Sequence, residues 1–173
     1  MKYRMYFFVP YSLSPIQKGI QAGHAALEYA STYGDTAQYQ SFIANDKTWI
    51  LLDGGTSRWG FMDVEFGSGG MNEIFSQLSD NNIPFEYFTE PDINFALTAV
   101  CFLADERVWD FENYPDFMDG YNFEYARNLL GSKITPEYLE KTRPEDYQKW
   151  VESIGGEKNV FLRELIRCKK LAN

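Results

Sequence analysis

The sequence contains one histidine, His24, and two cysteines, Cys101 and Cys168. A single histidine leaves few side chains that suit a transition metal, and the cysteines lie too far apart for metal-ligand spacing. We therefore expect no metal site and no cofactor. Two distant cysteines also provide no disulfide framework, which favours reduced thiols in a cytoplasmic protein.

Positive charge is scarce, because 16 lysines and arginines face 25 acidic residues and the net charge is −9. Nucleic-acid affinity depends largely on cations that neutralise phosphates, so this balance disfavours broad binding to DNA or RNA. A local basic pocket for one small anion stays possible. We interpret the cations near the C-terminal end as a solvated face or as partners of a helix dipole. They are Arg163, Arg167, Lys169 and Lys170.

Long hydrophobic runs and a signal-peptide pattern are also missing, so we expect no membrane partner. Hydrophobic residues still make up 45% of the 173 residues and aromatic residues 17%, which argues against disorder. A chain of this length and composition can bury a hydrophobic core.

The strongest local pattern is a helix that starts at Ser14-Pro15, because serine caps free amides and proline suits the first helical position. Most of the following residues are small or apolar, which predicts a helix buried nearly all round. Its polar residues form one stripe, which should meet a pocket, a partner or a buried network. The stripe consists of Gln17, Gln21, His24 and Glu28. Alternatively, the glycines only let the helix approach a sheet, and His24 is a core histidine with satisfied nitrogens.

Alternating strand and helix signals predict a mixed α/β sheet of four to five strands flanked by helices, with a helical C-terminal extension. The expected strands are residues 3–11, 48–52, 59–66, 85–88 and 97–104, and the expected helices between them are residues 14–33, 35–44 and 71–79. Helical segments follow at residues 105–111, 123–130, 136–141, 144–154 and 157–171. We expect an α/β core over residues 1–104 and an aromatic-rich extension over residues 105–173. The extension should pack on the core or on a second subunit, so we expect a homo-oligomer.

Residues 3–104 resemble the type 2 peptidyl-tRNA hydrolases. The likeness rests on the order of elements and on Gln21, His24 and Ala25, which match the Gln-x-x-His-Ala motif of that family. Ile83-Pro84 and Thr98 match its later pattern loosely. The resemblance implies the hydrolase fold for the core. It has no counterpart for the C-terminal third.

The chain departs from that family at several positions. The family has a Gly-Lys pair where this chain has Ile16-Gln17, and Lys18 is one position further along, about 100° around the helix. The shorter loop at residues 90–94 offers Asp92 as the acid and lacks one threonine. The whole chain also resembles proteins of tailed bacteriophages that share its segments 16–25 and 105–108, which suggests a viral source and a host-cell cytoplasmic location.

These observations leave two main hypotheses and a third. The leading one is non-catalytic binding of a nucleotide-like small molecule, as a phage counter-defence protein that sequesters a host nucleotide signal. Its expected ligand-binding residues are Gln17, Lys18, Gln21, His24, Asn94, Thr98 and Arg107. The alternative is hydrolysis of peptidyl- or aminoacyl-tRNA, with His24 and Asp92 activating a water molecule. The third is a protein inhibitor that mimics nucleic acid, which dispersed rather than clustered acidic residues disfavour.

Overall fold

A computed structural model describes residues 1–57, 70–117, 141–167 and 169–172. The chain forms two compact units, the first made of Met1–Glu106 with Leu165–Asn173, and the second of Arg107–Glu164. The expected strand at residues 59–66 and the expected helix at 123–130 lie outside the described residues. The expected helix at 136–141 lies outside them as well, except for its last residue.

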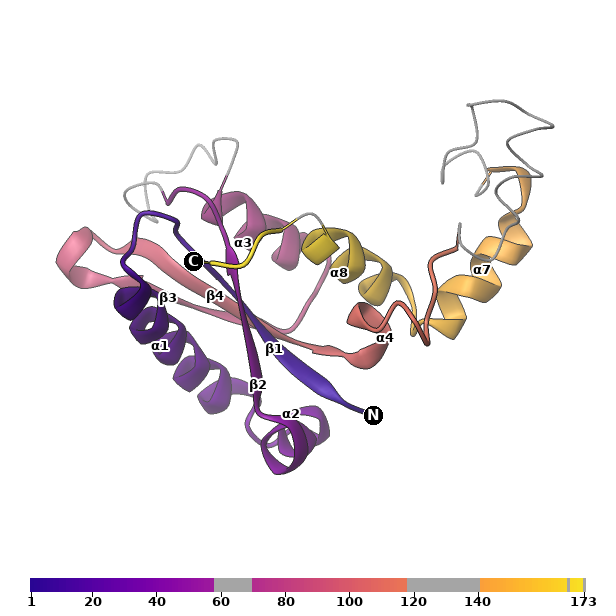
Figure 1. Ribbon diagram of the computed structural model, residues 1–173, viewed down its shortest axis with the longest axis horizontal. Coiled ribbons are helices and arrows are strands. Elements are labelled where there is room, and N and C mark those ends of the chain that lie inside the picture. Colours follow the sequence, from indigo (N-terminus) through magenta and orange to yellow (C-terminus); the bar gives the residue numbers. More distant parts are fainter. Residues whose placement is uncertain (58–69, 118–140, 168, 173) are drawn as a thin grey trace. The chain divides into compact units, whose positions relative to one another are not determined.

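The first unit contains a four-stranded mixed sheet in the order β2-β1-β4-β3. The strands are β1 (Tyr3–Val9), β2 (Thr48–Asp53), β3 (Phe85–Glu90) and β4 (Ala96–Asp105). β1 pairs with β2 in parallel and with β4 antiparallel, while β3 pairs with β4 antiparallel. The coarse α/β prediction is therefore confirmed, with helices on both faces of the sheet (Figure 1).

The long helix α1 (Pro15–Tyr33) connects the two parallel strands and covers one face of the sheet. Ser14 accepts a hydrogen bond from the Gln17 backbone amide, and the Gln17 side chain accepts one from the Ser14 amide. This reciprocal capping box fixes the predicted start of the helix. Alternate residues of β1 pack against the helix in a shared core. That core contains Met5, Phe7, Val9, Ala22, Ala25, Tyr29, Phe42, Ala99 and Cys101.

Shorter helices complete the first unit. After α1 come α2 (Ala37–Ser41) and one π-helical turn, η1 (Phe42–Asp46), which together replace the predicted helix at residues 35–44. The helix α3 (Met71–Asp80) lies on the opposite face of the sheet from α1 (Figure 1) and contacts β4. It buries Met71, Ile74 and Leu78, spaced three and four residues apart as an amphipathic helix requires.

The outer edge of β2 is partly covered by the end of the first unit. The Asp53 amide donates to the Lys170 carbonyl at 2.9 Å, and the Ala172 amide donates to the Leu51 carbonyl at 3.0 Å. Leu52 and Leu171 thus form an antiparallel bridge. The sequence predicted helix as far as residue 171 here, but the chain runs extended because β2 offers unpaired backbone groups.

The described helices of the C-terminal region are α4 (Glu106–Trp109), α7 (Pro144–Ser153) and α8 (Glu157–Arg167). Within the second unit, Phe117 packs against Tyr147 and Trp150. Arg163 is 1% exposed, so its interpretation as part of a solvated cationic face is wrong. Its guanidinium instead donates to Asp116 and to the carbonyls of Arg107 and Tyr114.

The core beneath α1 contains two ionisable groups, the Tyr29 phenol and the Cys101 thiol. Burial raises the pKa of both above their ordinary values. As pH rises, the unfolded chain therefore loses these protons before the folded protein does. The stability that these two protonated groups contribute is fully present below the pKa values of the unfolded chain and is lost as pH rises above them.

We expect stability to fall above roughly pH 9, by up to about 1.4 kcal/mol per pH unit for each group. Urea unfolding at pH values from 7 to 10.5 measures this slope. Tyr29→Phe should flatten the slope, and Tyr11→Phe, at an exposed position, should leave it unchanged. Equal slopes for the wild type and Tyr29→Phe would contradict the assignment.

Candidate functional site

The sequence predicted that α1 is apolar and buried nearly all round, but the structure buries only one side of the helix. Lys18 and Gln21 are 4% and 6% exposed, whereas Ile16 and Leu27 are 77% and 70% exposed. Two polar side chains therefore lie on the sheet side of the helix, and large apolar side chains lie on its outer side. Of the predicted polar stripe, only Gln21 is buried, while Gln17, His24 and Glu28 are exposed.

Gln21 is the centre of a group that we call the polar cluster, made of Gln21, its hydrogen-bond partners Glu90 and Thr98, and the buried Lys18. The Thr98 hydroxyl donates to Gln21 Oε1 at 2.6 Å. Gln21 Nε2 donates to Glu90 Oε2, also at 2.6 Å. Lys18 lies one helical turn before Gln21 on the same buried side of α1. Because Gln21 uses both ends of its amide, the cluster joins α1 to β3 and β4.

An irregularity in β4 brings Thr98 into this cluster. Phe88 pairs with Ala99 but Thr89 pairs with Leu97, so Thr98 is an extra residue opposite β3. Ala99 and Cys101 already face α1 in the core, and strict alternation would turn Thr98 to the other face. The bulge lets Thr98 and Ala99 both face α1, and bulges of this kind often aim a side chain at a site.

His24 lies beside the polar cluster on α1, and its ring stacks on Phe88 of β3. The ring centroids are 4.4 Å apart and the planes differ by 20°. His24 is exposed and Phe88 is half-buried. Among the described residues, the side chain in contact with His24 is the Phe88 ring and not a carboxylate. This part of the structure therefore supplies no acid that would orient the imidazole as a general base.

The other predicted site residues lie in different settings. Gln17 belongs to the capping box of α1. Asp92 is exposed in η2 (Pro91–Ile93), the single 3-10 turn after β3, and Asn94 follows it with a left-handed φ of 54°. Arg107 belongs to the second unit. Of the predicted set, the structure joins Gln21 and Thr98 by a hydrogen bond and places Lys18 and His24 on the same helix.

Sequence reasoning missed Glu90 and Phe88. It selected the acid from the turn, Asp92, although the carboxylate that meets Gln21 is the last residue of β3. A usable signal was present, since Phe88 and Glu90 are two residues apart on a strand and therefore share a face. Placing Gln21 opposite that face would have identified both.

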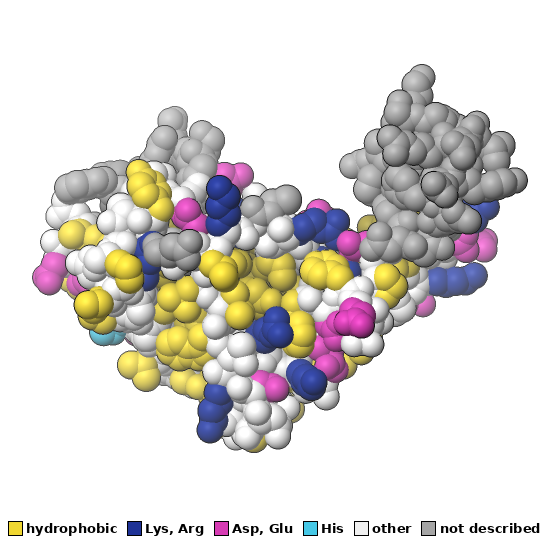
Figure 2. Space-filling view, viewed as in Figure 1, with side chains coloured by type: hydrophobic (Ala, Val, Ile, Leu, Met, Phe, Trp, Pro, Cys, Tyr) yellow, Lys and Arg dark blue, Asp and Glu magenta, His cyan; other side chains and the backbone are white. Residues whose placement is uncertain are grey.

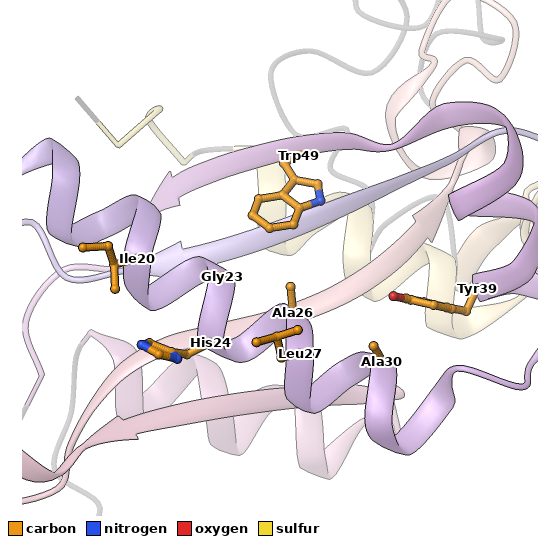
Figure 3. Close-up of a pocket in the computed structure, with 8 residues that line it drawn as sticks. All are labelled: Ile20, Gly23, His24, Ala26, Leu27, Ala30, Tyr39 and Trp49. Carbon is orange, nitrogen blue, oxygen red and sulfur yellow. The ribbon is translucent and has the colours of Figure 1, made fainter.

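An open pocket of about 470 Å³ lies along α1 on the side toward β2. Ile20, Gly23, His24, Ala26, Leu27, Ala30, Tyr39 and Trp49 line it. Figure 3 shows Trp49 projecting from β2 toward the helix, while His24 leaves the helix on the opposite side. None of the described residues that line the pocket is a lysine, arginine, aspartate or glutamate, so it is an apolar hollow with aromatic walls.

In the described ranges, no three His, Cys, Asp or Glu side chains are grouped so that they could hold a metal ion. Helices long and apolar enough to cross a membrane are likewise absent from this part of the chain. The chain finds no match among known protein families, curated proteins or solved structures.

Proposed function

We propose that the chain binds a nucleotide-like small molecule where the polar cluster meets the His24–Phe88 pair, and that it catalyses no reaction on it. The observation that carries this proposal is the placement of the exposed His24 ring, stacked on Phe88, beside the buried Gln21 amide, Thr98 hydroxyl and Lys18 ammonium and the half-buried Glu90 carboxylate. An aromatic ring offers a face to a nucleobase, and the polar groups can read its edges. Lys18 contributes a positive charge that favours a neighbouring phosphate.

The setting of His24 favours binding over catalysis. A general base is usually oriented by a hydrogen bond to a third group, as in acid–histidine pairs. The described contacts of His24 are with a ring, and Asp92 lies in an exposed turn. No lysine or arginine is among the described residues that line the pocket next to His24, whereas the backbone of a tRNA calls for cations.

The likeness to proteins of tailed bacteriophages supports a biological role for this binding. A phage protein that holds a host nucleotide signal lowers its free concentration without chemistry. The proposed ligand is therefore such a signal, and the proposed place of action is the host cytoplasm.

Native mass spectrometry of the full chain purified from bacterial cells tests the proposal directly. We expect a stoichiometric adduct of nucleotide size, which denaturing release would identify. Titration calorimetry with nucleoside monophosphates and cyclic dinucleotides would then give the affinity. His24→Ala should weaken binding roughly five- to a hundredfold, because a stacked base contributes about 1–3 kcal/mol.

Glu28→Ala is the matched control, since Glu28 is exposed on the same helix one turn beyond His24. It should leave the affinity unchanged. A protein that carries no adduct and binds none of the nucleotides would exclude the proposed function. Equal loss of affinity in both variants would show that His24 has no specific part in binding.

Hydrolysis of peptidyl- or aminoacyl-tRNA remains the second candidate. One observation favours it: Gln21 and Thr98, both matched in the resemblance to the type 2 hydrolases, are hydrogen-bonded to each other beside an acid. Release of the amino acid from a labelled aminoacyl-tRNA, lost in His24→Ala, would support this candidate over the first.

A further inference from the structure

The outer side of α1 carries a regular apolar surface that the described fold does not use. We define the outer face of α1 as Ile16, Gly19, Ile20, Gly23, Leu27 and Ala30. Ile16, Ile20 and Leu27 are 77%, 52% and 70% exposed, which is unusual for large aliphatic side chains. The buried residues of the helix lie on its other side.

The spacing of this face matches that of a helix-pairing seam. Ile16, Ile20, Gly23, Leu27 and Ala30 follow one another at intervals of four, three, four and three residues. This alternation is the spacing of the contact positions in coiled coils. It keeps one line of side chains available to a second helix along the whole length of α1.

The pocket beside α1 extends this surface toward β2. Its floor and walls include Ile20, Gly23 and Leu27 of the helix, with Trp49 on the β2 side (Figure 3). Trp49 is 44% exposed and rests on Phe7, with ring centroids 4.7 Å apart. Figure 2 shows hydrophobic side chains gathered between α1 and β2 on the face toward the viewer. A partner helix on α1 could thus place large side chains in the hollow.

Charge indicates which partner fits. Over residues 16–30, which span the outer face, the formally charged residues are Lys18, which is 4% exposed, and Glu28, which lies to the side of the face, in a chain of net charge −9. A nucleic acid, an anionic membrane or a charged peptide would each call for charges around the apolar face. A second copy calls for none, because it presents the same apolar face.

The shape of the outer face also favours a second copy of this chain as the partner. A Cβ atom placed on Gly19 or Gly23 would meet nothing within 4 Å, so the space above both glycines is open. Large side chains at Ile20 and Leu27 stand next to these open positions. A surface that carries both projections and hollows can pair with itself about a two-fold axis, as an isologous interface requires.

We propose that the outer face of α1 and the adjoining pocket bind a second copy of this chain, with the two α1 helices in contact near Gly23. This interface differs from the one expected from the sequence, which was the aromatic C-terminal region. It shares His24 with the proposed ligand site, because His24 lines the pocket and also stacks on Phe88 of β3.

Sedimentation velocity of the full-length protein at 1–100 µM tests the proposal. We expect a species of twice the 20.1 kDa chain mass. Leu27→Glu should weaken the association at least a hundredfold, because each dimer would bring two carboxylates into the seam. Leu171→Glu is the matched control, at a leucine that is 63% exposed in the same unit, and should leave the dimer intact.

A second measurement locates the contact without disturbing the fold. Gly23→Cys should form a disulfide-linked dimer under mild oxidation, whereas Glu28→Cys, to the side of the seam, should not. Circular dichroism of each variant confirms that it folds. A monomer throughout the concentration range, or a dimer that survives Leu27→Glu, would overturn the proposal, as would equal cross-linking at both cysteine positions.

Discussion

Replacing Arg163 with methionine is expected to destabilise the second unit by about 3 kcal/mol, the low end of the cost of breaking a buried ion pair, because Asp116 stays 21% exposed. Its Nη2 donates to Asp116 Oδ1 at 2.7 Å and to the Tyr114 carbonyl at 2.8 Å. Its Nη1 donates to the Arg107 carbonyl at 2.5 Å. One side chain therefore joins three separate positions of the chain, and methionine fills the volume without replacing any donor.

Hydrogen–deuterium exchange measures the loss locally, because the two units need not unfold together. Peptides from α7 and α8 should lose protection in Arg163→Met, while those from β1 should keep it. Arg163→Lys should recover only part of the protection, since lysine lacks the planar fork of donors. Arg167→Met is the control one turn further along α8, where the side chain is exposed. If both methionine variants behaved alike, the network around Arg163 would have no special role.

Replacing Gln21 with leucine is expected to destabilise the first unit by about 1–2 kcal/mol, because it removes the hydrogen bonds of Gln21 to Glu90 and to the Thr98 hydroxyl, which keeps the Phe88 carbonyl as an acceptor. Gln21 is 6% exposed, so water would replace the lost bonds poorly. Urea unfolding would give the change in free energy. Gln38→Leu, at an exposed position of α2, should change stability by less than about 0.5 kcal/mol.

A second variant tests the chemistry of the same contact. Gln21→Glu brings a carboxylate against Glu90, and two adjoining carboxylates hold a shared proton, which raises a pKa. Stability from a raised pKa is present at low pH and is lost as pH rises. This variant should therefore recover stability as pH falls from 7 toward 5, and Gln21→Leu should not. A parallel pH dependence in the two variants would exclude the direct Gln21–Glu90 contact.

Much of the sheet and its helices could be predicted from the sequence. The Ser14-Pro15 start of α1 was visible because capping chemistry is local, and the aromatic run of β1 and the final strand were visible because their apolar character is continuous. The side of α1 that faces the sheet could not be predicted. Its buried side carries Lys18 and Gln21, and its exposed side carries Ile16 and Leu27, so its apolar pattern does not indicate which side is buried.

Only part of the candidate site could be predicted from the sequence, for related reasons. Gln21 and Thr98 were both predicted to bind the ligand, and the structure joins them by a hydrogen bond, but Glu90 was missed because the pairing register that brings it to Gln21 is set by tertiary contacts. The bulge at Thr98 breaks the alternation that a strand pattern assumes. Arg163 was wrongly predicted to lie on a solvated face, because a run of charges in a sequence does not distinguish a buried cation from an exposed one.

The partial covering of β2 also has a consequence for the order in which the protein folds during translation. β2 ends at Asp53, and its antiparallel partner, around Leu171, leaves the ribosome after the whole of the second unit. Until then the outer edge of β2 at Leu51–Asp53 lacks these backbone partners, and an unpaired edge can recruit strands from other chains. The nascent protein is thus most exposed to aggregation while the second unit is being made.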